Sequence, residues 1–289
     1  MRIPTTRRTH SLVAASRTAV ALAVVGSLWA LGSNAVAAPT AVGLGTAGSF
    51  AVLAGETGIH NTGPTTIMGD IGTFPGTSIT GASDVTLLSG TNHADDSVTQ
   101  GAKTDLVTAY DTAAGEVPPT GTITADLAGV TLTPGVYKSP GTIHLSVGGV
   151  LTLDPGSDPN PVWVFQAGSD LVTESGSKVV MLNGAPPSCN VYWQVVSSAT
   201  LGTNSTFIGT IMALTSISLQ TGAKLDGRAL ARDGAVTLDS NTITRPACST
   251  STSTSTPTAT TPSTSTRTGA AQITAVPRGP VGTGDNSIG

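Results

Sequence analysis

The chain has 289 residues, of which 10% are charged and 3% aromatic, and it contains 35 glycines and 18 prolines. Ordinary soluble domains contain about 25% charged residues. With a formal net charge of -4, the chain lacks the basic stripe that a nucleic-acid-binding protein needs to follow phosphates. Its 38% apolar content is too high for a disordered acidic protein. We therefore expect a fold of many short strands joined by turns, and no nucleic-acid partner.

Residues 1–37 have the pattern of a secretory signal peptide. Four arginines precede the apolar stretch Ala19 to Leu31, and Ala35-Val36-Ala37 supplies the small residues of a cleavage site. The apolar stretch is shorter than the ~20 residues that a membrane-spanning helix needs, and no later segment could span a membrane. We expect a secreted protein.

The C-terminal part is also distinct in composition. Residues 249–266 contain only Ser, Thr, Pro and Ala, which is typical of an extended linker because such a segment cannot bury a core. Residues 267–289 contain few large apolar side chains, and we expect a flexible tail there. A single domain is therefore predicted over residues 38–248.

The two cysteines, Cys189 and Cys248, both lie in the exported part of the chain. Secreted chains with an even number of cysteines usually pair them. We predict a Cys189–Cys248 disulfide that fastens the last residues of the domain to its interior.

A repeat of 18 residues dominates the region from 198 to 231. Leu201, Phe207 and Ile211 recur as Leu219, Leu225 and Ala229. A weaker copy follows from residue 234, and the pairs Phe165/Trp193 and Ser175/Thr203 extend the repeat upstream at a spacing of 28 residues. This period is too short for helical repeats and indicates a β-solenoid with three short strands per coil and with the repeated apolar residues inside.

One segment, residues 92–115, lacks the alternation of a strand. Its small and apolar residues follow helical spacing, at Ala94, Val98, Ala102, Leu106, Ala109 and Ala113. Asn92 suits the N-cap, Asp95 and Asp96 suit the first turn, and Gly115 suits the C′ position. We predict one long helix lying beside the solenoid, between an N-terminal strand region (44–90) and the main coils (130–244).

Several stretches of the chain resemble the secreted ice-binding-protein-like family. They include Leu44 to Gly55, Gly69 to Gly72, Leu132 to Tyr137, Ala199 to Ser205 and Asp226 to Ala231. The resemblance covers nearly the whole predicted domain. It implies an all-β dominated, right-handed, discontinuous three-faced β-solenoid with one long helix packed alongside.

The resemblance also implies adsorption to ice through one flat face, on which some members carry a Thr-Ala/Gly-x-Thr/Asn pattern. The matching stretches begin at Ser175, Thr203 and Thr221. The predicted ice-binding residues are Ser175, Ser177, Thr200, Thr203, Ser205, Thr206, Ser218, Thr221, Thr237, Ser240 and Thr242. Two stretches depart from the pattern, because Lys178 and Lys224 stand where the last Thr or Asn is expected. An ammonium group orders water in its own geometry, so these lysines should weaken ice binding if they point outward.

Outward Ser and Thr residues are also ordinary in secreted β proteins. The alternative function is therefore a structural or adhesive module at the cell surface, held to the cell envelope through the linker and the tail. No catalytic motif appears. His60, His93 and His144 are far apart, and we expect each in a turn or at a helix end. We expect a monomer that is not an enzyme and binds no metal and no cofactor.

Overall fold

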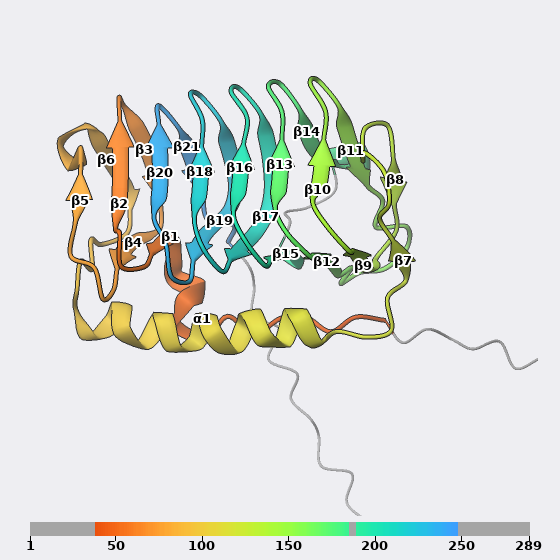
Figure 1. The fold of residues 1–289 in the computed structure, drawn as a ribbon, viewed down its shortest axis with the longest axis horizontal. Coiled ribbons are helices and arrows are strands. Elements are labelled where there is room, and N and C mark those ends of the chain that lie inside the picture. The colour runs from red at the N-terminus through yellow and green to blue at the C-terminus, as the bar shows by residue number, and fades with distance from the viewer. Residues whose placement is uncertain (1–37, 185–188, 248–289) are drawn as a thin grey trace, which may run out of the picture. The chain divides into compact units, whose positions relative to one another are not determined.

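The computed structural model describes residues 38–184 and 189–247. The predicted signal peptide (1–37), linker (249–266) and tail (267–289), as well as Cys248, lie outside these ranges. In the described part, no helix is long and apolar enough to cross a membrane. The described residues form a β-solenoid of parallel strands with one long helix beside it, as the repeat predicts (Figure 1).

The solenoid has three faces, and face 1 is a separate sheet of seven short strands. In spatial order they are β10 (Ile143–Leu145), β13 (Leu171–Thr173), β16 (Ala199–Leu201), β18 (Ile217–Leu219), β20 (Val236–Asp239), β2 (Ile59–Thr62) and β5 (Ile79–Thr80). The predicted repeat is confirmed here, because Leu201 pairs with Leu219 and Leu219 with Leu238.

Face 2 contains the next strand of each coil. It consists of β8 (Thr131–Leu132), β11 (Val150–Leu153), β14 (Lys178–Met181), the first parts of β17 (Thr206–Ala213) and β19 (Lys224–Ala231), β21 (Thr242–Thr244), β3 (Thr65–Met68) and β6 (Val85–Ser89). The pairing of Phe207 with Leu225 places both side chains inside, as predicted.

The third face, the helix face, lies against the helix α1 (Ser97–Gly115). Its strands are β7 (Gly121–Thr122), β9 (Gly135–Ser139), β12 (Trp163–Ala167), β15 (Val191–Val195), the second parts of β17 and β19, β1 (Phe50–Ala54) and β4 (Asp70–Thr73). Short 3-10 helices occur at Gly45–Ser49, Ala82–Asp84 and Leu182–Gly184.

The order of the coils in space differs from their order in the chain. The N-terminal strands β1, β2 and β3 pair with the C-terminal strands β19, β20 and β21. The helix then returns the chain along the whole stack, so that the middle of the sequence builds the opposite end (Figure 1). This arrangement confirms the discontinuous solenoid that the family resemblance implies.

The interior is apolar and contains a column of aromatic rings from successive coils. The ring centroids of Tyr137 and Phe165 lie 5.6 Å apart, and those of Phe165 and Trp193 lie 3.8 Å apart. Phe207 continues the column at 4.8 Å from Trp193. Because each coil alone exposes its interior, stacking of this kind supplies most of the stability of a solenoid.

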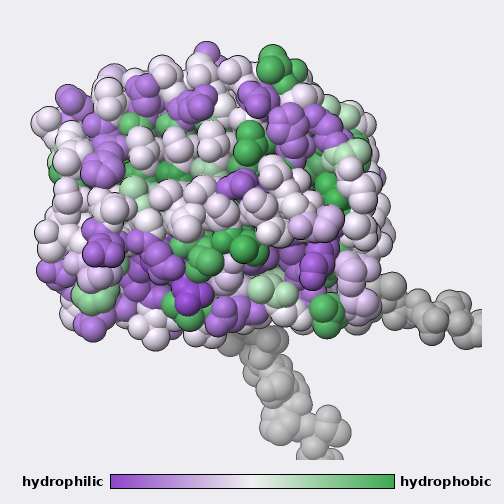
Figure 2. Space-filling view, in the orientation of Figure 1, coloured by the Kyte–Doolittle hydropathy of each residue, from purple (hydrophilic) through white to green (hydrophobic). Residues whose placement is uncertain are grey.

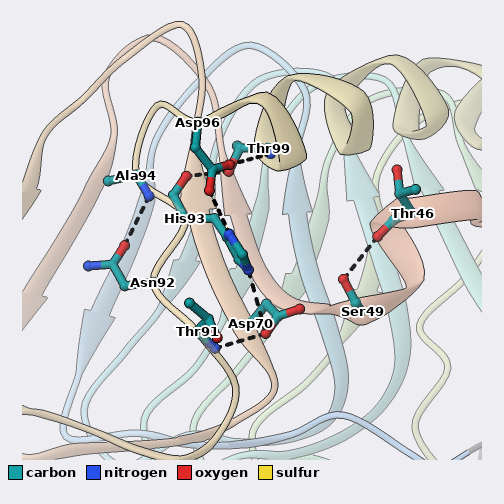
Figure 3. A network of polar contacts seen from close by, with 9 residues as sticks. All are labelled: Thr46, Ser49, Asp70, Thr91, Asn92, His93, Ala94, Asp96 and Thr99. Atoms are coloured by element: carbon teal, nitrogen blue, oxygen red, sulfur yellow. Dashed lines mark hydrogen bonds and ion pairs between the residues drawn. The ribbon is translucent and has the colours of Figure 1, made fainter.

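The helix begins later than predicted, at Ser97 instead of Asn92. The N–H groups of His93 and Asp95 donate to the carbonyls of Ile71 and Thr73, so this segment adds to β4 instead of joining the helix. Asp96 is the N-cap, not a first-turn residue, and its carboxylate accepts a bond of 2.9 Å from the Thr99 N–H (Figure 3). This bond, together with one from His93, lowers the pKa of Asp96.

The predicted apolar stripe of the helix is confirmed only in part. Ala102, Leu106, Ala109 and Ala113 are fully buried against the helix face. Ala94 lies before the helix, and Val98 is 43% exposed on the outer side. Gly115 is the last helical residue rather than the C′ residue.

Candidate surface for ice binding

The four-residue pattern found in the sequence forms the corner between faces 1 and 2. Its first residue, such as Thr203 or Thr221, begins the turn that follows the face 1 strand. Its second residue has a left-handed backbone, as at Asn204 (φ 54°) and Gly222 (φ 71°). Because glycine and asparagine adopt this conformation most readily, the geometry of the turn explains why these residue types recur at that position.

The third residue of the pattern points into the protein. Ser177 and Ser205 are each 1% exposed, and the Ser177 hydroxyl donates a bond of 2.7 Å to the carbonyl of Glu174. Because neither hydroxyl can reach an ice surface, we remove both residues from the predicted ice-binding residues. The alternation expected for a strand fails here because the turn inserts a left-handed residue before them.

The fourth residue begins face 2 and points outward. Strand pairing aligns these residues in a first row: Val150, Lys178, Thr206, Lys224, Thr242, Thr66 and Thr86. A second row, two residues further along each strand, contains Thr152, Val180, Asp226, Thr244 and Met68. Ile208 has the same register position but is only 8% exposed and belongs to the interior cluster. On β6 a register shift places Ser89, three residues after Thr86, opposite Met68. Face 2 therefore presents two parallel rows dominated by Thr and other β-branched side chains.

Three charged residues interrupt these rows. Lys178 and Lys224 are both exposed, which is the orientation that the sequence analysis considered unfavourable. Asp226, beside Lys224 in the second row, is half-buried, and burial raises the pKa of its carboxyl against the opposing effect of Arg228. The part of the face formed by β21, β3 and β6 carries no charged residue in either row.

Face 1 presents a narrower surface. Each three-residue strand has one outward side chain at its centre, and the row reads His144, Val172, Thr200, Ser218, Thr237, His60 and Thr80. Figure 2 shows this face in front, mostly in the pale colours of residues with intermediate hydropathy. Two acidic side chains stand at the ends of its strands. Glu174 directly follows β13, and Asp239 is the last residue of β20.

The predicted site residues are thus divided among three places. Thr200, Ser218 and Thr237 lie on face 1, and Thr206 and Thr242 lie on face 2. The corner holds Ser175, Thr203, Thr221 and Ser240, of which Ser240 occupies the left-handed position (φ 53°). The Thr221 hydroxyl donates to the Asp239 carboxylate, so the corner threonines also serve contacts between coils.

The sequence analysis missed the outward residues of the N-terminal strands. Thr66 and Thr86 continue the first row of face 2. The sequence analysis also missed Thr244 of β21 and Thr152 of β11, which stand in the second row. The 18-residue repeat does not extend to residues 59–89, so it could not align them. The stretch Thr65-Thr66-Ile67-Met68 has the composition of a strand, and the structure buries Thr65 and Ile67 while Thr66 and Met68 are more exposed.

The histidines differ from the expectation in two cases. His60 and His144 lie on strands β2 and β10, not in turns, while His93 does precede the helix. His144 lies between two carboxylates, with Nδ1 2.9 Å from Asp126 and Nε2 3.5 Å from Glu174. Among residues 38–184 and 189–247, no group of three or more His, Cys, Asp or Glu could hold a metal ion.

Cys189 lies between the 3-10 helix Leu182–Gly184 and β15, and it is disulfide-bonded. Its predicted partner, Cys248, lies outside the described residues. The pairing of these two residues therefore stays a prediction.

Comparisons with known proteins agree with this architecture. The family described as ice-binding-like matches residues 53–244. An ice-binding protein of Nostoc is 47% identical over 208 residues, which are 72% of this chain and 75% of the relative. An ice-binding protein of Colwellia is 34% identical over 82% of this chain and 96% of its own length.

Solved structures show the same similarity. An ice-binding protein from an Antarctic biological consortium superimposes with a TM-score of 0.68 at 47% identity, over 72% of this chain and 92% of that one. An ice-binding protein from an Arctic yeast, described together with its antifreeze activity, gives a TM-score of 0.64 at 29% identity over 72% and 96%. The chain belongs to the ice-binding-like family.

Proposed function

We propose that the protein is exported and adsorbs to ice through face 2, inhibiting the growth or recrystallisation of ice crystals. The observation that carries this proposal is the double row of outward side chains on face 2, of which strand pairing keeps the first row in register across the whole face. Family membership and the signal-peptide pattern of residues 1–37 support the same function and an extracellular location.

The two rows give face 2 regularity in two directions. Neighbouring strands repeat at ~4.8 Å, and residues two apart along a strand repeat at ~6.6 Å. The strand spacing is close to the repeat of oxygen positions in ice. Each threonine offers a methyl group that orders water into a cage and a hydroxyl that holds the cage to the protein, and a water layer that is already ordered costs little to immobilise. Such a layer can join a crystal plane.

The charged residues limit the strength of this surface. Lys178 and Lys224 interrupt the first row, whereas Thr242, Thr66 and Thr86 form an unbroken run. We therefore assign the main contact to the part of face 2 formed by β21, β3 and β6. A protein of modest ice affinity is expected.

Face 1 is the second candidate surface. Its Thr200, Ser218 and Thr237 form an uncharged row, but one side chain per strand gives regularity in one direction only. The other function kept from the sequence is a structural or adhesive module attached to the cell envelope through residues 249–289. The hydroxyl-rich faces are compatible with either function, so an ice assay has to separate them.

The test is recrystallisation of ice in sucrose solution with purified chain 38–289 at micromolar concentration. We expect slower grain growth than in buffer and faceted single crystals. Thr242→Tyr and Thr66→Tyr should each abolish the effect because the bulky ring disturbs the flat rows. The matched controls, Thr200→Tyr and Ser218→Tyr on face 1, should retain it.

Each result decides between the candidates. Unchanged grain growth and unshaped crystals with the unsubstituted chain would remove ice binding and leave the structural module. Loss of activity in the face 1 variants alone would move the site to face 1. Equal melting temperatures of all four variants show that the substitutions act on the surface and not on folding.

A further inference from the structure

The two halves of face 2 differ in charge. In the half formed by β21, β3 and β6, neither row contains a charged residue, whereas the half formed by β11, β14, β17 and β19 carries both lysines of the face. Lys178 and Lys224 stand in the first row on either side of Thr206. One strand separates them, so their backbones lie about 10 Å apart. We call the half with the lysines the cationic half.

These two lysines dominate the positive charge at the surface of the described part. The chain as a whole is acidic, with a formal net charge of -4. Within residues 38–184 and 189–247, only three lysine or arginine residues are exposed, while the others are partly or fully buried. Two of the three are Lys178 and Lys224, and the third is Lys138 on β9 of the helix face. Exposed positive charge is therefore concentrated on face 2.

The fold itself does not require lysine at either position. Thr206, Thr242 and Thr66 fill the same register position on neighbouring strands, so threonine is compatible with it. The ion pairs within the described ranges are formed elsewhere, and none of them includes either lysine. Both ammonium groups are therefore available to an anion outside the protein.

The surroundings of the lysines are apolar and hydroxylated. Val150 precedes Lys178 in the first row and is 37% exposed, and Val147, in the turn before β11, is 73% exposed. A threonine hydroxyl lies between the two lysines. The one acidic residue in the two rows, Asp226, is half-buried, and Arg228 attracts its carboxylate. The cationic half thus combines positive charge, a hydroxyl group and small apolar side chains on one face of a sheet.

We propose that the cationic half binds an acidic polysaccharide, namely a polymer of uronic acids. Such a polymer carries carboxylates for the ammonium groups, hydroxyls for the threonine and apolar C–H faces of its rings for the valines. An extended polymer can lie across the parallel strands and reach both lysines. Binding at the second lysine is then intramolecular, which strengthens the association beyond that of a single ion pair.

Other polyanions fit this surface less well. A nucleic acid or a polyphosphate is bound through many cations along its backbone, and the cationic half has two exposed ones. An anionic membrane takes up aromatic or long apolar side chains that insert among the lipids, whereas the exposed apolar residues beside the lysines are short valines. These polyanions therefore serve as contrasts in the test.

The proposal gives the two halves of face 2 different partners. This consequence rests on the proposed function, because it assigns ice to the uncharged rows of β21, β3 and β6. A polymer that lies over β11 to β19 leaves those rows free. The lysines that disfavour contact with ice then hold a polysaccharide, and one face joins that polysaccharide to the crystal.

Retention of chain 38–289 on immobilised alginate, a polymer of uronic acids, tests the proposal at low ionic strength. We expect retention on alginate, none on neutral dextran, and release by salt, because exposed ion pairs are screened. An acidic protein without a cationic surface is repelled by a polyanion. Lys178→Thr together with Lys224→Thr should weaken the binding by about tenfold. The matched control, Lys138→Thr at the third exposed lysine, should leave it unchanged.

Passage of the unsubstituted chain through the alginate column overturns the proposal, as does a double variant that is retained as strongly as the unsubstituted chain. Equal or stronger binding to polyphosphate, or to vesicles that contain phosphatidylglycerol, also overturns it, because it assigns the lysines to phosphate groups. Equal melting temperatures show that the substitutions act on the surface and not on folding.

One further variant separates the two halves of the face. Thr66→Tyr should abolish the effect on ice and keep the retention on alginate. A chain that binds alginate without slowing recrystallisation overturns only the proposed function. A chain that slows recrystallisation without binding alginate overturns only the polysaccharide site.

Discussion

Lys103 of the helix and Ala231 of β19 are joined by a hydrogen bond of 2.7 Å from the ammonium group to the backbone carbonyl. The same ammonium donates to the carbonyl of Ala54 at 3.3 Å and to that of Arg232. Lys103 thereby ties the helix to the ends of β1 and β19, the two strands that pair across the break in the chain. Burial lowers the pKa of Lys103 to about 8, with Asp233 opposing this change.

This contact predicts a dependence of stability on pH. The pKa falls from 10.5 in the free side chain to about 8 in the fold, so between these values the unfolded chain binds more protons. Lys103 therefore makes the free energy of unfolding rise with pH, by about 3 kcal/mol in total. This gain is fully present above pH 10.5 and is lost as the pH falls through 8. Urea unfolding of the unsubstituted chain and of Lys103→Met across this window measures the difference.

The difference in unfolding free energy between these two chains should grow with rising pH. Lys138→Met, at an exposed lysine of β9, is the control and should show no such growth. A pH slope that is the same in Lys103→Met as in the unsubstituted chain would assign the effect to other groups.

Gln166 provides a second tie, at the C-terminal end of the helix. Its Nε2 donates to the carbonyls of Ala113 at 2.8 Å, Ala114 at 3.3 Å and Glu116 at 3.0 Å. The last carbonyls of a helix have no partner within it. Gln166→Leu should therefore lower the free energy of unfolding by about 1–3 kcal/mol, as measured by urea denaturation.

Two further variants test the cause. Gln166→Glu keeps the size of the side chain but replaces the donor by a carboxylate, and it should destabilise more than Gln166→Leu. Gln100→Leu, on the exposed side of the helix, should change little. Equal effects of Gln166→Leu and Gln100→Leu would contradict a capping role.

Features that depend on residues close together in the chain could be predicted from the sequence, whereas features that depend on contacts between distant residues could not. In the coils from 198 to 244, each position has a fixed environment in every turn of the solenoid, so Leu201, Leu219 and Leu238 could be aligned from the repeat alone. The pairing of His60 with Thr237 joins strands from opposite ends of the domain, and no local pattern indicates it. Only the family resemblance implied a discontinuous solenoid.

The same limit explains the errors in the helix and in the site. Residues 92–96 have helical composition, but the hydrogen bonds of His93 and Asp95 to β4 are tertiary contacts that override it. Ser177 and Ser205 could not be recognised as buried, because the left-handed residue before each of them shifts the alternation. The hydroxyl content of the surface could be predicted, whereas its division between two faces could not.

The left-handed corner predicts how glycine substitutions behave. Gly176 has a φ of +68°, and a Cβ added there would meet no atom within 4 Å. Gly176→Ala should therefore cost about 1–2 kcal/mol from backbone strain alone. Gly176→Asn should cost less, because asparagine already occupies the equivalent corner position at Asn204. Thermal unfolding of both variants measures the order.

Gly141→Ala is the matched control for this prediction. An added Cβ at Gly141 also meets no atom within 4 Å, but its backbone is not left-handed. Alanine there should be neutral or slightly stabilising because it reduces the freedom of the unfolded chain. A similar loss of stability at Gly141 and Gly176 would show that the backbone conformation is not the cause.

Replacing the lysines of face 2 should strengthen ice binding. Lys178 pairs with Thr206, and Thr206 pairs with Lys224, so Lys178→Thr and Lys224→Thr together would extend the threonine row without interruption from β14 to β6. Removing the two ammonium groups frees the water above the face from their hydration geometry. The double variant should slow recrystallisation at a several-fold lower concentration than the unsubstituted chain, and Lys138→Thr on β9 should not. Unchanged or weaker activity of the double variant, at an unchanged melting temperature, would mean that the ice contact does not extend along the first row to β19 and β14.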